Sequence, residues 1–304
     1  MIPAAPLLRS AVTLRDWRRD QDPRGVVKTM RKIVVAIIAC TALGAANAEE
    51  RNPLEAKFVV DTGWFFMSND TRVRVDGETT GETGTDIDYD NTFGLGDFDR
   101  FRAEALWRFT DSGRHVIRGM YFKNDRSSTR NIDRDINFGD ETYPVGASVT
   151  AGSELAIIQV AYDYAFLRRE NYELAGGIGL HMLDAKLSLA ATLATQGGST
   201  TRSAAEEGST GVPLPVLGLR GVWRPSHSFY ITGQVQYFYI EFDPYKGSLL
   251  DLKATAVWQA TDHFGIGVGY NDFGFSFDID DEGDFTGRLR WDYGGAMAFA
   301  TFMF

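Results

Sequence analysis

The sequence is poor in cysteine and histidine, with one cysteine, Cys40, and four histidines in 304 residues. A single cysteine excludes a disulfide framework and metal sites that need several thiolates. The chain also lacks an apolar run of about 20 residues, the length that a transmembrane helix needs. Its longest run, from Ile33 to Ala46, is shorter and includes Thr41 and Gly44. A membrane-spanning helix is therefore not expected.

This short apolar run has the parts of an export signal. Arg31 and Lys32 supply a positive start, residues 33–45 an apolar core, and Ala46-Asn47-Ala48 a small-x-small cleavage site. We therefore expect residues 30–48 to be a signal peptide, with translation starting at Met30. Residues 1–29 are then interpreted as a non-native upstream extension.

Two other interpretations of the N-terminal region stay open. Ile37-Ile38-Ala39-Cys40 loosely resembles a lipobox, which would make Cys40 a lipidated first residue. Arg18-Arg19 resembles a twin-arginine signal, although the charged Asp20-Gln21-Asp22 follows where such a signal is apolar.

The part after the leader is strongly acidic. Without its first 48 residues the chain keeps 23 basic and 38 acidic residues, so its net charge is −15. A protein of this charge repels the phosphate backbone of DNA and RNA, because binding to them depends on lysine and arginine contacts. Nucleic-acid binding is therefore excluded as a function class.

From Phe58 onward apolar residues recur with a period of two, the period of β-strands. Ten such segments have 9–17 residues each, which fits tilted membrane-spanning strands of about 9–11 residues better than ordinary strands of about 5–6. They are Phe58–Ser68, Phe98–Phe109, His115–Lys123, Leu155–Leu167, Tyr172–Leu183, Val212–Arg224, Ser228–Phe242, Leu249–Ala260, Phe264–Phe277 and Arg288–Phe304.

The connections between these segments alternate in length. The tight polar ones are Thr110–Arg114, Arg168–Asn171, Pro225–His227 and Thr261–His263. The longer acidic or Gly/Ser/Thr-rich ones are Asn69–Asp97, Asn124–Glu154, Asp184–Gly211, Asp243–Ser248 and Asp278–Gly287. This asymmetry predicts an all-β fold: a closed antiparallel up-and-down transmembrane β-barrel of about ten strands (8–12), with long extracellular loops and short periplasmic turns. It would span residues 58–304 after a short periplasmic segment, 49–57; an acidic soluble β-sandwich is the alternative.

Two segments change parity midway. Apolar residues move from even to odd positions after Tyr270, and from odd to even positions after Tyr293. A slip of one residue turns every side chain to the other face, so one interpretation is a β-bulge near Asn271-Asp272 and another near Gly294-Gly295. The other is that the outer ends stand above the membrane, where the alternation relaxes.

The last residues carry a resemblance to a known protein group. Phe302 and Phe304 end an alternating apolar row, Ala298 to Phe304, which resembles the signal read by the barrel-assembly machinery of outer membranes. The chain as a whole resembles a group of Gram-negative outer-membrane barrels. The features shared with it are Thr92-Phe93-Gly94-Leu95, Pro213-Leu214-Pro215-Val216-Leu217-Gly218-Leu219-Arg220 and Trp291-Asp292-Tyr293. The resemblance implies a place in the bacterial outer membrane, with its lipid and lipopolysaccharide as partners, and implies no activity.

Catalysis is not expected from this sequence. Omptin-type proteases use an Asp-x-His unit, and the catalytic residues of outer-membrane lipases resemble a His-x-Ser unit. None of the four histidines has an Asp two residues before it or a Ser two residues after it. His115, His227 and His263 fall in or next to predicted turns, whereas His181 is expected to face the lumen as a packed, hydrogen-bonded residue.

Alternation places polar side chains of the segments in the lumen. They are Arg100, Arg102, Glu104, Arg108, Gln159, Asp163, Glu173, Arg220, Gln234, Gln236, Asp251, Lys253, Arg288, Arg290 and Asp292. Ten strands enclose a tube between filled eight-stranded barrels and open porins. Because both charge signs occur, we expect an ion-pair and hydrogen-bond network that plugs the lumen. The alternative is a thin polar pore whose arginines favour anions.

The long loops carry clustered carboxylates. Asp86, Asp88 and Asp90 occupy positions one, three and five of a calcium-loop pattern that lacks its glycine, and Asp280 and Asp284 lie in a second acidic run. Solvated charge is one interpretation of these clusters. Weak Ca²⁺ binding, or bridging to lipopolysaccharide phosphates through divalent ions, is the other. No other cofactor is expected.

Two function classes follow. The first is a structural or interaction barrel whose acidic loops face outside partners. The second is a passive transporter, either a narrow porin-like polar channel or a conduit for small hydrophobic solutes. Phe238, Ile240 and Phe242, on the lumen side near the outer rim, are the hint of the hydrophobic version.

Overall fold

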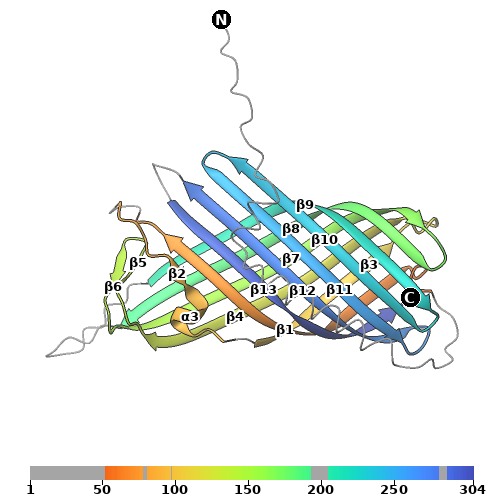
Figure 1. Cartoon of the computed structure of the whole chain (residues 1–304), viewed down its shortest axis with the longest axis horizontal. Helices are drawn as coiled ribbons and strands as arrows, with labels where there is room; N and C mark the ends of the chain where they lie inside the picture. Colours follow the sequence, from red (N-terminus) through yellow and green to blue (C-terminus); the bar gives the residue numbers. More distant parts are fainter. Residues whose placement is uncertain (1–51, 78–80, 97, 193–204, 281–285) are drawn as a thin grey trace, which may run out of the picture. The chain divides into compact units, whose positions relative to one another are not determined.

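The computed structural model describes residues 52–77, 81–96, 98–192, 205–280 and 286–304. Ten long strands of these residues form one antiparallel sheet in which neighbours in sequence are paired. The first strand also pairs with the last, from Val59 with Met303 to Val75 with Gly287, so the sheet closes into the expected barrel (Figure 1). The strands are β1 (Phe58–Val75), β3 (Phe98–Arg108), β4 (His115–Asn131), β7 (Ser148–Arg168), β8 (Tyr172–Thr192), β9 (Ala205–Ser226), β10 (Phe229–Phe242), β11 (Tyr245–Gln259), β12 (Phe264–Asp280) and β13 (Thr286–Met303).

Short elements fill two of the long connections. They are β2 (Ile87–Asp88) and α3 (Tyr89–Phe93) between β1 and β3, and β5 (Ile136–Phe138) and β6 (Glu141–Tyr143) between β4 and β7. No helix among the described residues is both long and apolar enough to cross a membrane. The expected signal peptide, 30–48, and the stretch 1–29 lie outside the described residues.

One connection is shorter than predicted. β10 and β11 pair up to Phe242 with Tyr245, so only Asp243 and Pro244 join them, where a linker over 243–248 was expected. Residues 245–248 continue as strand because they also pair with β12, beginning at Tyr245 with Ile279.

An apolar belt covers the outward face of the barrel. Every barrel strand exposes at least one large apolar side chain there, such as Trp64 on β1 at 60% and Leu217 on β9 at 69% exposure. Phe302 and Phe304 belong to the same face. A closed barrel with such a belt is stable in lipid, and short turns at one rim with long loops at the other are typical of the bacterial outer membrane. The chain is therefore an outer-membrane barrel with both strand termini on the periplasmic side.

Most strands are longer than the membrane requires. β7 and β8 have 21 residues each and β9 has 22, whereas about 9–11 residues cross the hydrocarbon layer. The belt lies on the periplasmic part of each strand, so the additional residues raise the barrel wall above the membrane on the outer side.

The predicted bulges are absent from β12 and β13. Their pairing runs without a register shift from Phe264 with Phe302 to Asp280 with Thr286. What changes is the chemistry of the inward row, which consists of glycines up to Gly269 and of Phe273 and Phe275 beyond Asn271. Above the belt the interior is apolar and the outward face is charged. The change of parity in the sequence therefore marks the membrane boundary, and the bulge prediction was wrong.

Candidate functional site in the barrel interior

Twelve of the fifteen polar residues expected in the lumen lie inside the barrel. They are Arg100, Arg102, Glu104, Arg108, Gln159, Asp163, Glu173, Arg220, Gln234, Gln236, Asp251 and Lys253. The other three, Arg288, Arg290 and Asp292, face outward on β13, because Trp291 and Tyr293 fill the interior at 1% and 3% exposure. The prediction that these three side chains face the lumen was wrong, because β13 has no bulge that would reverse its faces.

A layer of buried ion pairs crosses the periplasmic half of the interior. Glu173, which is fully buried, receives Arg108 at 3.0 Å, Arg220 at 2.5 Å and Arg168 at 3.6 Å. Asp163 receives Arg118 at 2.6 Å and Arg220 at 3.2 Å. These residues come from β3, β4, β7, β8 and β9, so the layer ties half of the barrel wall together.

A second charged layer joins β3 to β11 and β12. Glu104 accepts from Arg102 at 2.9 Å and pairs with Lys253. Arg102 also donates to the Asn271 Oδ1 at 2.5 Å, and Asn271 donates to the Asp251 Oδ1 at 2.5 Å. The layer joins β3, β11 and β12 across the lumen, and each of its cations has a counter-charge or an acceptor.

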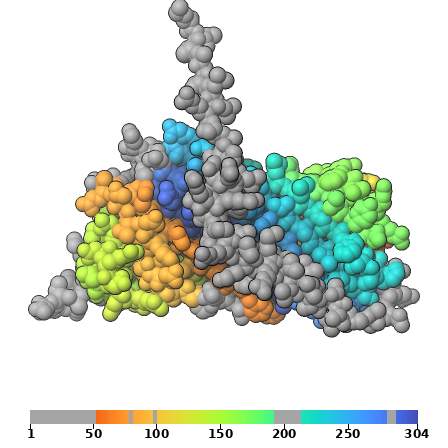
Figure 2. All heavy atoms as spheres, in the orientation of Figure 1, coloured from red at the N-terminus to blue at the C-terminus, as the bar shows by residue number. Residues whose placement is uncertain are grey.

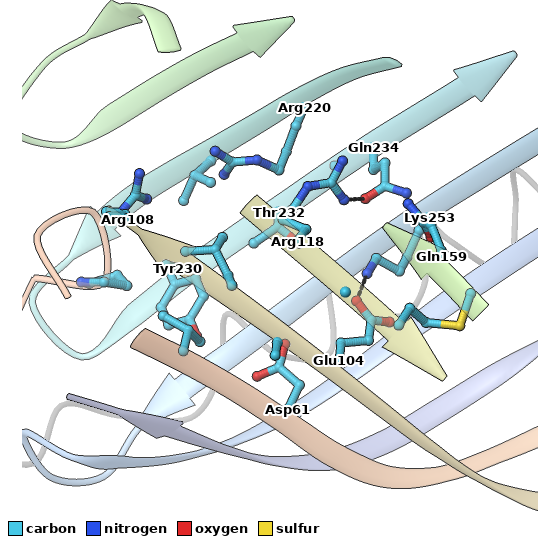
Figure 3. A pocket seen from close by; sticks show the side chains of 18 residues that line it. Asp61, Glu104, Arg108, Arg118, Gln159, Arg220, Tyr230, Thr232, Gln234 and Lys253 are labelled. Atoms are coloured by element: carbon cyan, nitrogen blue, oxygen red, sulfur yellow. Dashed lines mark hydrogen bonds and ion pairs between the residues drawn. The ribbon is translucent and has the colours of Figure 1, made fainter. Parts of the chain in front are cut away.

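A small polar cavity remains between the two layers. Its volume is about 90 Å³ and its lining includes Asp61, Glu104, Arg118, Tyr230 and Lys253 (Figure 3). Figure 3 shows the pairs Glu104–Lys253 and Arg118–Gln234 at its edge. Sequence reasoning missed Asp61 and Arg118, although both continue the inward parity of their strands.

Glutamine and histidine form the upper boundary of the polar interior. Gln236 accepts from Gln159 at 3.0 Å and lies 2.9 Å from the His181 Nε2. His181 has no exposed surface, and its ring stacks on Phe273 at 6.2 Å. The structure thus places His181 inside the barrel as a packed residue next to Gln236.

The N-terminal segment enters the periplasmic mouth of the barrel, which the sequence did not predict. Residues 52–56 form a turn, and Leu54, 1% exposed, packs against Val222, Tyr230 and Val257 inside the barrel. Asn52 donates to the Glu170 carbonyl at 2.8 Å, and Arg168 donates to the Leu54 carbonyl at 2.6 Å. The turn therefore lies in the periplasmic mouth and is held there by these two hydrogen bonds.

The outer half of the interior is a hydrophobic core. Phe65, Phe122, Phe273 and Tyr293 form an aromatic group, with Tyr293 stacked on Phe273 at 4.6 Å and 5.6–5.8 Å from the other two rings. Phe238, expected to face the lumen, packs against this core, whereas Phe242 is 55% exposed at the hairpin tip. The side chains at this level of the interior are therefore mainly apolar.

Two loop elements complete the outer core. Tyr89 and Phe93 of α3 have no exposed surface, and Phe138 of β5 and Tyr143 of β6 are 2% exposed. In Figure 2 the orange atoms, which run from β1 to α3, lie beside the yellow-green atoms of β5 and β6 at one end of the barrel. Residues of α3, β5 and β6 therefore belong to the hydrophobic core at the outer end of the barrel.

A buried ion pair anchors α3 to the wall. Asp90 pairs with Arg126 of β4, whose side chain has no exposed surface, and accepts from the Thr71 backbone N–H at 2.6 Å. Burial raises the pKa of the Asp90 carboxyl, and the Arg126 guanidinium opposes that rise. Burial likewise raises the pKa of the Tyr89 phenol. Asp90 thus lies in a poorly hydrated place, where Arg126 is its counter-charge.

The carboxylates proposed for calcium have other roles. Both oxygens of Asp88 accept from Asn91, at 3.1 and 2.7 Å, because Asp88 caps α3, and Asp90 is taken by Arg126 and Thr71. A helix stands where one of the two interpretations placed a calcium loop, and Asp86, Asp88 and Asp90 are not grouped around a common point. Within the described residues no group of three or more His, Cys, Asp or Glu is placed to hold a metal. Asp284 and the Asp280 side chain lie outside them.

Three solved structures illustrate the similarity of the chain to known proteins. The outer membrane protease OmpT from Escherichia coli is 13% identical, covers 87% of this chain and 100% of its own, and has a TM-score of 0.47. Ail, the attachment invasion locus protein of Yersinia pestis, is 12% identical over 82% and 99%, with a TM-score of 0.34. The toluene transporter TodX of Pseudomonas putida is 6% identical over 81% and 89%, with a TM-score of 0.31.

No protein-family model matches the sequence, and a search of curated proteins gave no match. Identities and TM-scores this low connect the chain to no activity of the three proteins above.

Proposed function

We propose that this protein is a sealed, non-conducting outer-membrane barrel that acts through the surface it holds above the membrane. The observation that carries the proposal is the succession of packed side-chain groups that the described residues form along the barrel axis. The turn around Leu54, the ion-pair layers around Glu173 and Glu104, and the aromatic core around Tyr293 follow one another along the axis.

If the interior is sealed, the surface above the membrane is the part of the protein that can contact other molecules. The wall continues above the belt, and α3 with the β5–β6 hairpin forms a cap packed on the aromatic core. A cap fixed in this way presents a defined surface to the outside, as an interaction protein needs. We propose no catalytic role, since the described histidines are engaged in packing and hydrogen bonds, such as His115 with the Tyr162 hydroxyl at 2.7 Å.

A narrow polar channel is the second candidate, favoured by the cavity of about 90 Å³ between the charged layers. Such a channel would need the turn around Leu54 and the aromatic core to open together. The arginines around the cavity would then favour anions.

Conductance separates the two candidates. We expect the refolded protein to give no channel events in planar lipid bilayers, because charged and apolar side chains fill the lumen in successive layers. The matched measurement uses a variant lacking residues 52–56, which opens the periplasmic mouth alone and is expected to stay silent too, since the outer core remains. Regular anion-selective steps from the folded wild type would favour the channel.

A further inference from the structure

The barrel wall is interrupted on its outer side between β1 and β4. β3 pairs with β1 only up to Phe98 with Met67, and with β4 only up to Arg102 with Phe122. Above that level β1 pairs with the two residues of β2, and α3 follows directly. A short helix thus stands where the other strands continue as a ladder of backbone hydrogen bonds.

Side chains hold this part of the wall in place of the ladder. Arg100 of β3 donates to Asn124 at 3.0 Å and to the Asp125 carbonyl at 2.6 Å on β4. The polar anchors of α3 are the Asp90 carboxylate and the Tyr89 hydroxyl, the latter within 2.8 Å of the Gly152 and Ser188 carbonyls. Replacing α3 by another group therefore costs few backbone hydrogen bonds.

The space that α3 fills combines aromatic walls with one buried cation. Tyr89 and Phe93, 4.9 Å apart, belong to the same core as Phe122 and Trp291. Arg126 points into this core, with its guanidinium carbon 6.0 Å from the Trp291 ring. Both Arg126 Nε and Trp291 Nε1 are buried donors that have no hydrogen-bond partner among the described residues. The surroundings thus offer apolar ring contacts, one positive charge and two free donors.

We propose that this compartment is a binding site for a small aromatic carboxylate, and that α3 is its internal occupant. Tyr89 and Phe93 supply the rings, and Asp90 supplies the carboxylate that such a ligand would bring. A ligand with both parts can take the place of α3 without leaving Arg126 unpaired, because one carboxylate replaces another. A neutral aromatic molecule cannot, since it would leave a buried arginine without a counter-charge.

The site lies at the outer end of the barrel interior, at the level of Val73 and Ile87, and its residues belong to the outer aromatic core. The ion-pair layers and the N-terminal turn lie deeper in the barrel and form no part of it. A barrel that is closed to ions can therefore still exchange this ligand with the outside.

The test uses 2-naphthoate as the probe, with 2-naphthol as its neutral counterpart and acetate as the carboxylate without a ring. Full-length protein carrying Cys40→Ser and Asn91→Cys is labelled with a fluorophore at the introduced thiol, which reports the position of α3. We expect saturable binding of 2-naphthoate alone, accompanied by a change in the fluorescence of the label. Asp90→Asn removes the competing carboxylate and is expected to bind 2-naphthoate at least about tenfold more tightly, because the site is then open for a larger fraction of the time.

Two variants make the test specific. Arg126→Met is expected to abolish the preference for 2-naphthoate over 2-naphthol. Asp125→Asn, which neutralises an exposed, outward-facing carboxylate next to Arg126 on β4, is expected to leave binding unchanged. Should Asp90→Asn fail to fold, Tyr89→Ala keeps the ion pair, weakens the docking of α3 and is expected to tighten 2-naphthoate binding as well.

The proposal is overturned by any of three results. They are no saturable binding to a folded Asp90→Asn or Tyr89→Ala variant, equal binding of 2-naphthoate and 2-naphthol to these variants, and unchanged 2-naphthoate affinity after Arg126→Met. None of them bears on the bilayer conductance, so the proposed sealed barrel is judged separately.

Discussion

Replacing Glu173 by glutamine is expected to lower the free energy of unfolding by about 3–5 kcal/mol, the typical cost of breaking a buried ion pair from one side. Glu173 has no exposed surface and is the shared partner of Arg108, Arg168 and Arg220. A neutral amide at this fully buried position cannot balance three guanidinium groups. Equilibrium unfolding in urea, followed by tryptophan fluorescence in lipid vesicles, measures the loss.

The matched control is Glu154→Gln on β7, where the carboxylate faces outward and is exposed. No measurable change is expected there, because water already solvates the charge. Equal stability of the Glu173 and Glu154 variants would show that the buried layer does not hold the wall together.

The second large effect is expected at Trp291. Trp291→Ala should cost about 3–5 kcal/mol of unfolding free energy, as truncating a large buried aromatic residue leaves a cavity. The adjacent Arg290→Ala should leave stability unchanged, because Arg290 lies on the outward face above the belt. The two residues are neighbours on one strand, so the pair of variants tests directly which face of β13 is inside.

The sequence alone predicts the opposite order for this pair. If Arg290 faced the lumen, Arg290→Ala would lower the free energy of unfolding strongly and Trp291→Ala only mildly. Unfolding curves in which Arg290→Ala is the more destabilised variant would restore a bulge near Gly294 and contradict the pairing along β13.

The strands could be predicted because their signal is local. Alternation in segments such as Phe101–Phe109 reports burial one residue at a time, and the closed ten-strand barrel follows from it. The same signal misled on β12 and β13, because alternation shows that two faces differ and does not say which is inside. Below the belt the apolar face is outward, and above it the apolar face is inward.

The partners inside the barrel could not be predicted because they come from distant strands. Asp90 looked like a calcium ligand, since its counter-charge, Arg126, is far from it in the sequence and reaches it only after the barrel closes. The position of the turn around Leu54 could not be predicted either, because a single apolar residue in a polar segment shows no periodicity. Arg118 could have been found by extending the inward parity of its strand.

The proposal that the lumen is sealed can be tested most directly by the accessibility of introduced thiols in a Cys40→Ser background. Three single variants are compared: Gln236→Cys in the middle of the lumen, 1% exposed, Asn91→Cys on the outer cap and Ser112→Cys in a periplasmic turn. A large maleimide should modify the Asn91 variant on intact cells and the Ser112 variant only after the outer membrane is opened. A small charged thiosulfonate that reaches both sides should leave the folded Gln236 variant unmodified. Rapid modification of that variant from either side would contradict a closed lumen.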